Sequence, residues 1–182
     1  ILQSVLLIAI PTIMLILFLH VIITNMKINF KDIAYTFFGM AYVIGCIIFL
    51  ALSRGLENGR VLIWYAIIAA WGTDIFAYLI GKRFGKHKFS QVSPKKSIEG
   101  CIAGTIGAVV IALIYTFAIN SILNLSYSYV LVIIATAILS VVGQVGDFAA
   151  SSIKRYADIK DYSNLIPGHG GMLDRIDSLM FL

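Results

Sequence analysis

The sequence predicts an all-α integral membrane protein, a polytopic helical bundle with about six or more transmembrane helices and two polar loops on the cytoplasmic side. Three observations predict this fold class. First, 60% of the 182 residues are hydrophobic and only 13% are charged, whereas a soluble domain is about a quarter charged. Second, the apolar residues form long blocks. Third, the basic residues gather in loops that fall on one side of the predicted membrane.

Five apolar blocks have the roughly 20 residues that a helix needs to cross the hydrocarbon core of a bilayer. The first block has no basic lead-in and no small-residue cleavage site, so we expect a spanning helix rather than a signal peptide. The blocks are Leu2–Thr24, Ile33–Leu52, Val61–Ile80, Ile98–Ile122 and Tyr127–Ser151. A sixth block begins near Leu173 and reaches the last residue, Leu182. Because the chain starts at Ile1 and this block is unfinished, we expect a trimmed chain.

The loops that join these blocks divide the charges unequally. Three loops on one face carry twelve of the fourteen lysines and arginines, and the other face carries Arg54 and Arg60. An excess of basic residues marks the cytoplasmic side of a membrane protein. The net charge of +5 therefore reflects membrane topology, and we expect no nucleic-acid partner.

The chain shows no internal repeat, and we expect one membrane domain. Residues 1–60 would form the N-terminal transmembrane helices, and residues 61–182 carry every polar motif described below. Within the second region, Gly100 and Gly104 have the G-x-x-x-G spacing that allows two helices to approach closely. The spacing alone leaves open whether the partner helix belongs to the same chain or to a second copy.

Two carboxylates lie inside apolar blocks. Asp74 stands seven residues before Gly81, and Asp147 stands five residues before Ser152. An ionised group at that depth needs a partner or a water-filled cavity, and it marks a functional site more often than a structural one. We therefore expect both carboxylates to face a pocket that opens toward the cytoplasm.

A basic turn precedes the fourth block, in the segment from Ser93 to Gly100. Pro94 stiffens the turn, and Ser97 is a suitable N-cap for the helix that follows. The free amides at the start of a helix attract anions, and Lys95 and Lys96 stand beside them. The turn could hold a phosphate group, or it could be a solvated basic loop near acidic lipid headgroups.

The loop from Ser151 to Asp177 is the richest in polar side chains. Asp174 and Asp177 are three residues apart and so share a helix face. Magnesium prefers oxygen ligands, usually one or two carboxylates completed by water and substrate phosphates, and Asp147 could join these two residues. His169 could be an acid–base group, a phosphate donor or a backbone hydrogen-bond partner. The loop also has four basic residues that could neutralise phosphates: Lys154, Arg155, Lys160 and Arg175.

This loop resembles the signature of the phosphatidate cytidylyltransferases of bacterial type. From Ser151 to Asp177 it reads S-x-hydrophobic-K-R-x4-K-D and then P-x-H-G-G-hydrophobic-x-D-R-hydrophobic-D, without departure from that signature. The segments Gly72-Thr73-Asp74 and Ser93–Gly100 resemble the family in the same order, with Ser97 where the family more often has Thr. Up to about Arg60 the chain matches only in being hydrophobic.

The resemblance implies a multi-pass enzyme of the inner membrane that joins CTP to phosphatidate, releases pyrophosphate and faces the cytoplasm. It also implies membrane lipids as partners, a homodimer, and magnesium with or without a second cation. Positions matching Asp147 and Asp174 are metal ligands in the family, and we expect Asp177 to support them. The residues expected to act on the phosphates are Lys154, Arg155, Lys160, Asp161, His169 and Arg175. Those expected to bind substrate are Asp74, Ser93, Lys95, Lys96, Ser97, Gly170 and Gly171.

Two other classes of function stay open on the sequence. A CTP-dependent lipid alcohol kinase, or a cytidylyltransferase for another lipid phosphate, would share the membrane placement and the nucleotide chemistry. An ion-coupled transporter could use Asp74 and Asp147 as ion sites, but a transport site usually lies near the midplane of the bilayer. The polar residues here crowd one side, which favours the enzyme.

Overall fold

The computed structural model describes residues 2–24, 29–89, 93, 96–163, 165 and 170–182. These residues form helices joined by short connections, and an isolated strand-like bridge pairs Lys88 with Ser97. The chain divides into two compact units, residues 1–48 and 49–182. The prediction of an all-α, polytopic membrane protein is confirmed: four of the described helices are long and apolar enough to cross a membrane.

The first unit contains α1 (Leu2–Ile23) and most of α2 (Phe30–Arg54). A capping box starts α2, because Asn29 and Asp32 satisfy each other's backbone amides: the Asn29 amide donates to the Asp32 carboxylate at 2.8 Å, and the Asp32 amide donates to the Asn29 side chain at 3.2 Å. Both helices agree with the first two predicted apolar blocks.

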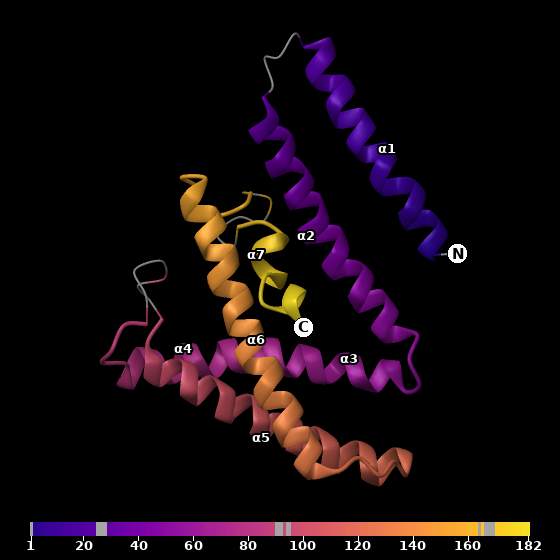
Figure 1. Cartoon of the computed structure of the whole chain (residues 1–182). Helices are drawn as coiled ribbons and strands as arrows, with labels where there is room; N and C mark the ends of the chain where they lie inside the picture. The colour runs from indigo at the N-terminus through magenta and orange to yellow at the C-terminus, as the bar shows by residue number, and fades with distance from the viewer. Residues whose placement is uncertain (1, 25–28, 90–92, 94–95, 164, 166–169) are drawn as a thin grey trace. The chain divides into compact units, whose positions relative to one another are not determined.

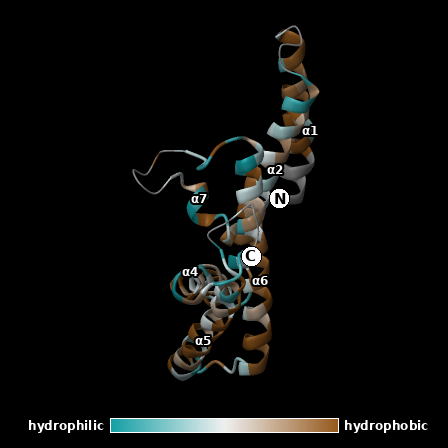
Figure 2. Cartoon of the chain, turned by 90° about the vertical axis from the view of Figure 1, so that its left-hand side faces the viewer, coloured by the Kyte–Doolittle hydropathy of each residue, from teal (hydrophilic) through white to brown (hydrophobic). Residues whose placement is uncertain are grey.

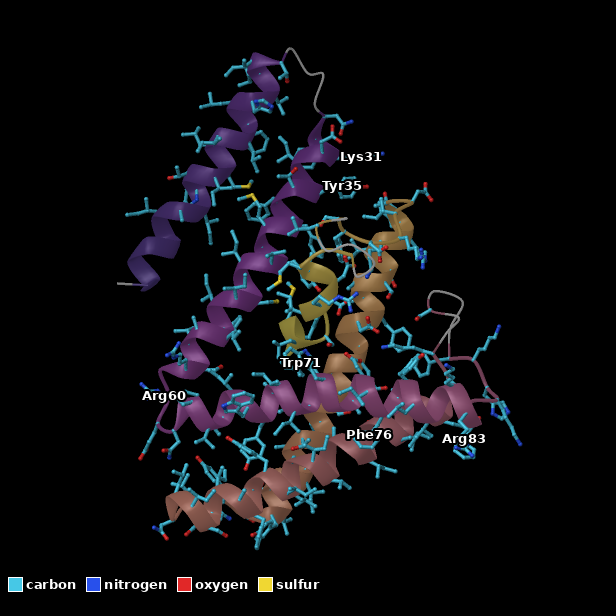
Figure 3. The ribbon with its side chains drawn as sticks, turned by 180° about the vertical axis from the view of Figure 1, so that it is seen from behind. Lys31, Tyr35, Arg60, Trp71, Phe76 and Arg83 are labelled. Carbon is cyan, nitrogen blue, oxygen red and sulfur yellow. The ribbon has the colours of Figure 1, made fainter. Side chains whose placement is uncertain are left out.

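The second unit is built on three long helical segments (Figure 1). The first is continuous from Gly59 to Phe84 and consists of α3 (Gly59–Ile67), a π-helical segment η1 (Ile68–Gly72) and α4 (Thr73–Phe84). The others are α5 (Ile98–Leu123) and α6 (Tyr129–Tyr156). Figure 3 shows Arg60 and Arg83 at opposite ends of the first segment.

Helix α5 packs closely against α4, and glycines make this approach possible. A Cβ atom added to Gly104 would lie 2.7 Å from the Thr73 carbonyl oxygen, and one added to Gly100 would lie 2.7 Å from the Ala77 carbonyl oxygen. Any larger residue would therefore push the two helices apart. The G-x-x-x-G spacing serves contact within one chain.

A buried polar network ties the three segments together inside the bundle. The hydroxyls of Thr73 and Ser140 hydrogen bond at 2.6 Å, and Ser140 donates to the Thr105 hydroxyl at 3.0 Å. Gln144 also donates to Thr105 at 3.0 Å. Each of these polar groups has a partner, which is the condition for burying it in a membrane protein.

The sixth apolar block differs from its prediction as a spanning helix. It forms a short helix α7 (Leu173–Ile176) and a 3-10 turn η2 (Leu179–Phe181), both near α6. Asp177 and Ser178 between them are buried. Ser178 donates to Asp74 of α4, and Asp177 lies 3.7 Å from Lys154 of α6, so these polar groups fix the segment against both helices. Figure 2 shows the contrast between hydrophilic residues near α7 and the mostly hydrophobic surfaces of α5 and α6.

Candidate functional site

One end of the second unit encloses a polar cavity of about 390 Å³. Helix α4, the start of α5, the last turns of α6 and the C-terminal segment all contribute to its wall. Three bases line it, namely Lys96, Lys154 and Arg175. Five carboxylates line it as well: Asp74, Asp147, Asp161, Asp174 and Asp177. The cavity therefore gathers acids and bases from segments that are far apart in the sequence, from Asp74 of α4 to Asp177 near the end of the chain.

The π-helical segment η1 positions Asp74. A π-helix adds a residue to a turn and often occurs at functional sites. Here it stands directly before Thr73, whose side chain is buried and bonded to Ser140. The next residue, Asp74, accepts a hydrogen bond of 3.2 Å from the Ser178 hydroxyl. The C-terminal segment is thereby connected to α4 across the cavity.

The start of α5 places Lys96. Ser97 caps this helix, as predicted, by accepting a hydrogen bond of 3.1 Å from the Gly100 amide. Lys96, just before the cap, forms an ion pair with Asp147 of α6. Its ammonium also lies 5.0 Å from the centre of the Phe148 ring, a cation–π distance. Lys96 thus stands between one charged partner and one aromatic partner.

Lys154 at the end of α6 holds the two acids of the C-terminal segment. Its ammonium donates to Asp174 at 2.8 Å and lies 3.7 Å from Asp177. The other oxygen of Asp174 accepts hydrogen bonds from the backbone amides of Tyr162 and Gly171, each at 2.9 Å. The Asp174 side chain is only 4% exposed, so these three donors account for its stability as an anion.

The two acids of this segment differ in their ionisation. Burial alone would raise the pKa of Asp174, but the Lys154 ammonium and the two amides outweigh it and hold that pKa below its ordinary value. Burial, and next the negative charge of Asp147, raise the pKa of Asp177 to about 6. Asp147 and Asp177 line the same cavity, so their negative charges oppose each other there.

The donor set fits a magnesium ion in its chemistry. Asp147, Asp174 and Asp177 offer oxygen ligands in one cavity, and a divalent cation would relieve the repulsion that raises the pKa of Asp177. The described residues contain no group of three or more acids, histidines or cysteines already spaced to hold a metal ion. Instead, Lys96 and Lys154 neutralise the three acids in this structure.

Most of the residues predicted for the site line the cavity. Ser93 and Ser97 lie in its wall with the acids and bases named above. Gly171 contributes through its amide to Asp174, and Gly170 precedes it with a positive φ of 81°. Arg155 and Lys160 are exposed and do not line the cavity. Lys95 and His169 lie outside the described residues.

Sequence reasoning missed two residues of the site, Tyr162 and Ser178. The backbone amide of Tyr162 donates to Asp174, and the centre of its ring lies 5.2 Å from the Lys154 ammonium. Its hydroxyl donates to the Ala150 carbonyl at 3.2 Å. Ser178 bonds Asp74. Tyr162 lies inside the polar loop and Ser178 directly after it, and this position was the only sequence signal for them. Neither is a fixed position of the signature from Ser151 to Asp177.

The fold and the cavity together define a class, namely polytopic helical membrane proteins with a site of paired acids and bases at one end of their spans. The chain belongs to the Cytidylyltransferase family, whose model matches residues 1–182.

Three relatives, each named phosphatidate cytidylyltransferase, show the extent of the similarity. The chain is 36% identical over 170 residues to the protein of Bacillus subtilis (strain 168) and 38% identical over 169 residues to that of Staphylococcus haemolyticus, with 92% of the chain covered in both cases. It is 37% identical over 166 residues to the protein of Staphylococcus aureus (strain COL), with 90% covered. The matches span 62%, 62% and 61% of the three relatives.

Proposed function

We propose that this protein transfers the cytidylyl group of CTP to phosphatidate, forming CDP-diacylglycerol and pyrophosphate for phospholipid synthesis. The observation that carries the proposal is the cavity in which three bases and five carboxylates meet at the end of apolar spans. One substrate is a lipid and the other is soluble in water, and a polar cavity at a membrane surface is accessible to both. The names of the relatives support the same reaction.

The reaction requires two polyanions to come together. A phosphate oxygen of phosphatidate attacks the α-phosphorus of CTP, a new P–O bond forms, and the bond to the β-phosphate breaks with release of pyrophosphate. The attacking group is already an anion, so positioning and charge neutralisation matter more than a general base. Lys96, Lys154 and Arg175 line the cavity and supply positive charge for the phosphate oxygens.

We propose that Asp147, Asp174 and Asp177 would hold magnesium, whose chemistry when bound is to neutralise the triphosphate. Lys96 and Lys154 already neutralise these acids, so both ammonium groups lie beside the carboxylates where phosphates would bind. Asp74 and Ser178 hold α4 to the C-terminal segment and fix the wall of the cavity. We propose that the protein works as a homodimer in the inner membrane, with the cavity open to the cytoplasm.

The test is a transfer assay on purified protein with phosphatidate, magnesium and CTP labelled in the cytidine. We expect label in the lipid and pyrophosphate in equal amounts. A lipid alcohol kinase would release CDP and leave the lipid without cytidine, and that result would overturn the proposal. A transporter would move substrate across sealed vesicles without consuming CTP.

Two variants test the roles of the acids. We expect Asp147→Asn and Asp174→Asn each to lower transfer by about 100-fold or more, because each change removes a charge that neighbouring groups in the cavity require. Asp158→Asn is the matched control, since Asp158 is an exposed carboxylate on the same loop, and it should keep the parent rate. Transfer near the parent rate in either cavity variant would remove that residue from the site.

A further inference from the structure

A second cavity of about 460 Å³ lies between α5 and α6, and it is a groove lined by apolar side chains. Ile102 of α5 and Val141 and Val145 of α6 form its rim. These three side chains are 54–59% exposed. Because α5 and α6 are long apolar helices of the membrane-spanning kind, we expect an open groove between them to face the hydrocarbon of the bilayer.

The polar atoms at the floor of the groove already have partners. Gln144 donates to the Thr105 hydroxyl at 3.0 Å and to the Cys101 carbonyl at 3.3 Å. The floor therefore offers few unsatisfied groups to water, and the groove suits an apolar occupant.

The groove meets the polar cavity at Cys101, which lines both. Phe148 forms the groove side of this junction, and its ring stacks on Phe89 with 4.6 Å between the ring centres. Lys96 forms the cavity side, with its ammonium over the Phe148 ring. The Lys96–Asp147 ion pair thus stands beside the apolar groove, on the other side of the Phe148 ring.

We propose that this groove binds an acyl chain of the lipid substrate while Lys96 binds its phosphate. Two observations favour this occupant: the Lys96 ammonium, which is paired with Asp147 in this structure, is of the sign that an anionic headgroup attracts, and the groove adjoins the cavity at Cys101, which lines both. A neutral lipid would fill the groove equally well but would gain nothing from Lys96. The identity of the lipid as phosphatidate rests on the proposed function, whereas the binding of an anionic lipid does not.

Photocrosslinking tests the groove without any need for activity. The probe is phosphatidate with a diazirine in its acyl chain, added to the parent protein in phosphatidylcholine vesicles. We expect adducts at Ile102, Val141 or Val145, suppressed by unlabelled phosphatidate and much less by diacylglycerol. Equal suppression by diacylglycerol would mean non-specific lipid and would overturn the proposal. Adducts that map elsewhere would mean that another segment or a second copy fills the groove, which would overturn it too.

Filling the groove provides the second test. We expect Val145→Trp to raise the KM for long-chain phosphatidate by about tenfold, to raise the KM for dioctanoyl phosphatidate less, and to leave the KM for CTP unchanged. Ile114→Trp is the control, because Ile114 lies on α5, is 64% exposed and lines neither cavity. An equal effect of Val145→Trp on both chain lengths would contradict the groove. Selective adducts from a parent protein that transfers no cytidylyl group would sink the proposed function and leave the groove standing.

Discussion

Lys154 is the residue on which most of the charge arrangement depends. Its ammonium contacts Asp174 and Asp177 and lies over the Tyr162 ring. The Lys154 side chain is only 12% exposed, so water cannot replace it as a partner for the two acids. Lys154 thus joins α6 to the C-terminal segment, together with the hydrogen bond from the Tyr162 hydroxyl to the Ala150 carbonyl.

We expect Lys154→Met to lower both transfer and stability. The change keeps an unbranched side chain of similar length but leaves two poorly exposed carboxylates without their cation, and breaking such a pair is costly. Transfer should fall by about 100-fold, and the melting temperature should fall by on the order of 4 °C. Activity measurements and thermal unfolding in detergent check the two effects.

Lys160→Met is the comparison for this prediction, since Lys160 is exposed and does not line the cavity. It should keep the melting temperature of the parent and lose less than tenfold in transfer. Equal losses in the two variants would show that the loop acts as a whole and that Lys154 has no special place in it.

At the scale of the element, the contact between α4 and α5 depends on glycine. We expect Gly104→Ala to destabilise the protein, because the added methyl group would collide with the Thr73 carbonyl, which is backbone and cannot rotate away. The loss should appear as a lower melting temperature, together with slower transfer, because Asp74 follows Thr73 directly.

The matched substitution is Gly45→Ala in α2, where an added Cβ atom meets nothing within 4 Å. Alanine has a higher helix propensity than glycine, so this variant should be as stable as the parent or slightly more stable. A Gly104→Ala variant that melts with the parent would show that α4 and α5 can separate without cost.

At the scale of the whole molecule, the cavity and the basic connections lie at the same end of the second unit. The connection after α4 carries Lys86, and the opposite connection between α5 and α6 carries Ser126. We expect the first to face the cytoplasm and the second to face the outside, since basic residues stay on the cytoplasmic side.

Membrane-impermeant maleimide checks this topology on Lys86→Cys and Ser126→Cys. Intact cells should label Ser126→Cys alone, and inverted vesicles should label Lys86→Cys alone. The parent protein is the control for label taken up by its own Cys46 and Cys101, because Cys101, although buried, lines the cavity. The reverse pattern would put the cavity on the outside and would contradict both the predicted topology and the proposed use of CTP.

The apolar blocks could be predicted well from the sequence because lipid acts on each segment separately. A span must bury its own backbone hydrogen bonds and present apolar side chains along its whole length, and both requirements are visible in about 20 consecutive residues. The last block, from Leu173, was the exception. Its apolar composition indicated a span, but Asp177 and Ser178 are buried against the bundle and the segment forms short turns.

The sequence by itself determined the class of protein, the five long helices, the chemical types at the site and the Ser97 cap, because each of these depends on residues close together in the chain. Only the tertiary structure decided that Lys96 pairs with Asp147, that Lys154 holds Asp174 and Asp177, and that Ser178 reaches Asp74. Which charge meets which depends on distances of a few ångströms between helices far apart in sequence. The packing of the helices sets those distances, and they cannot be read from the order of residues within any one helix.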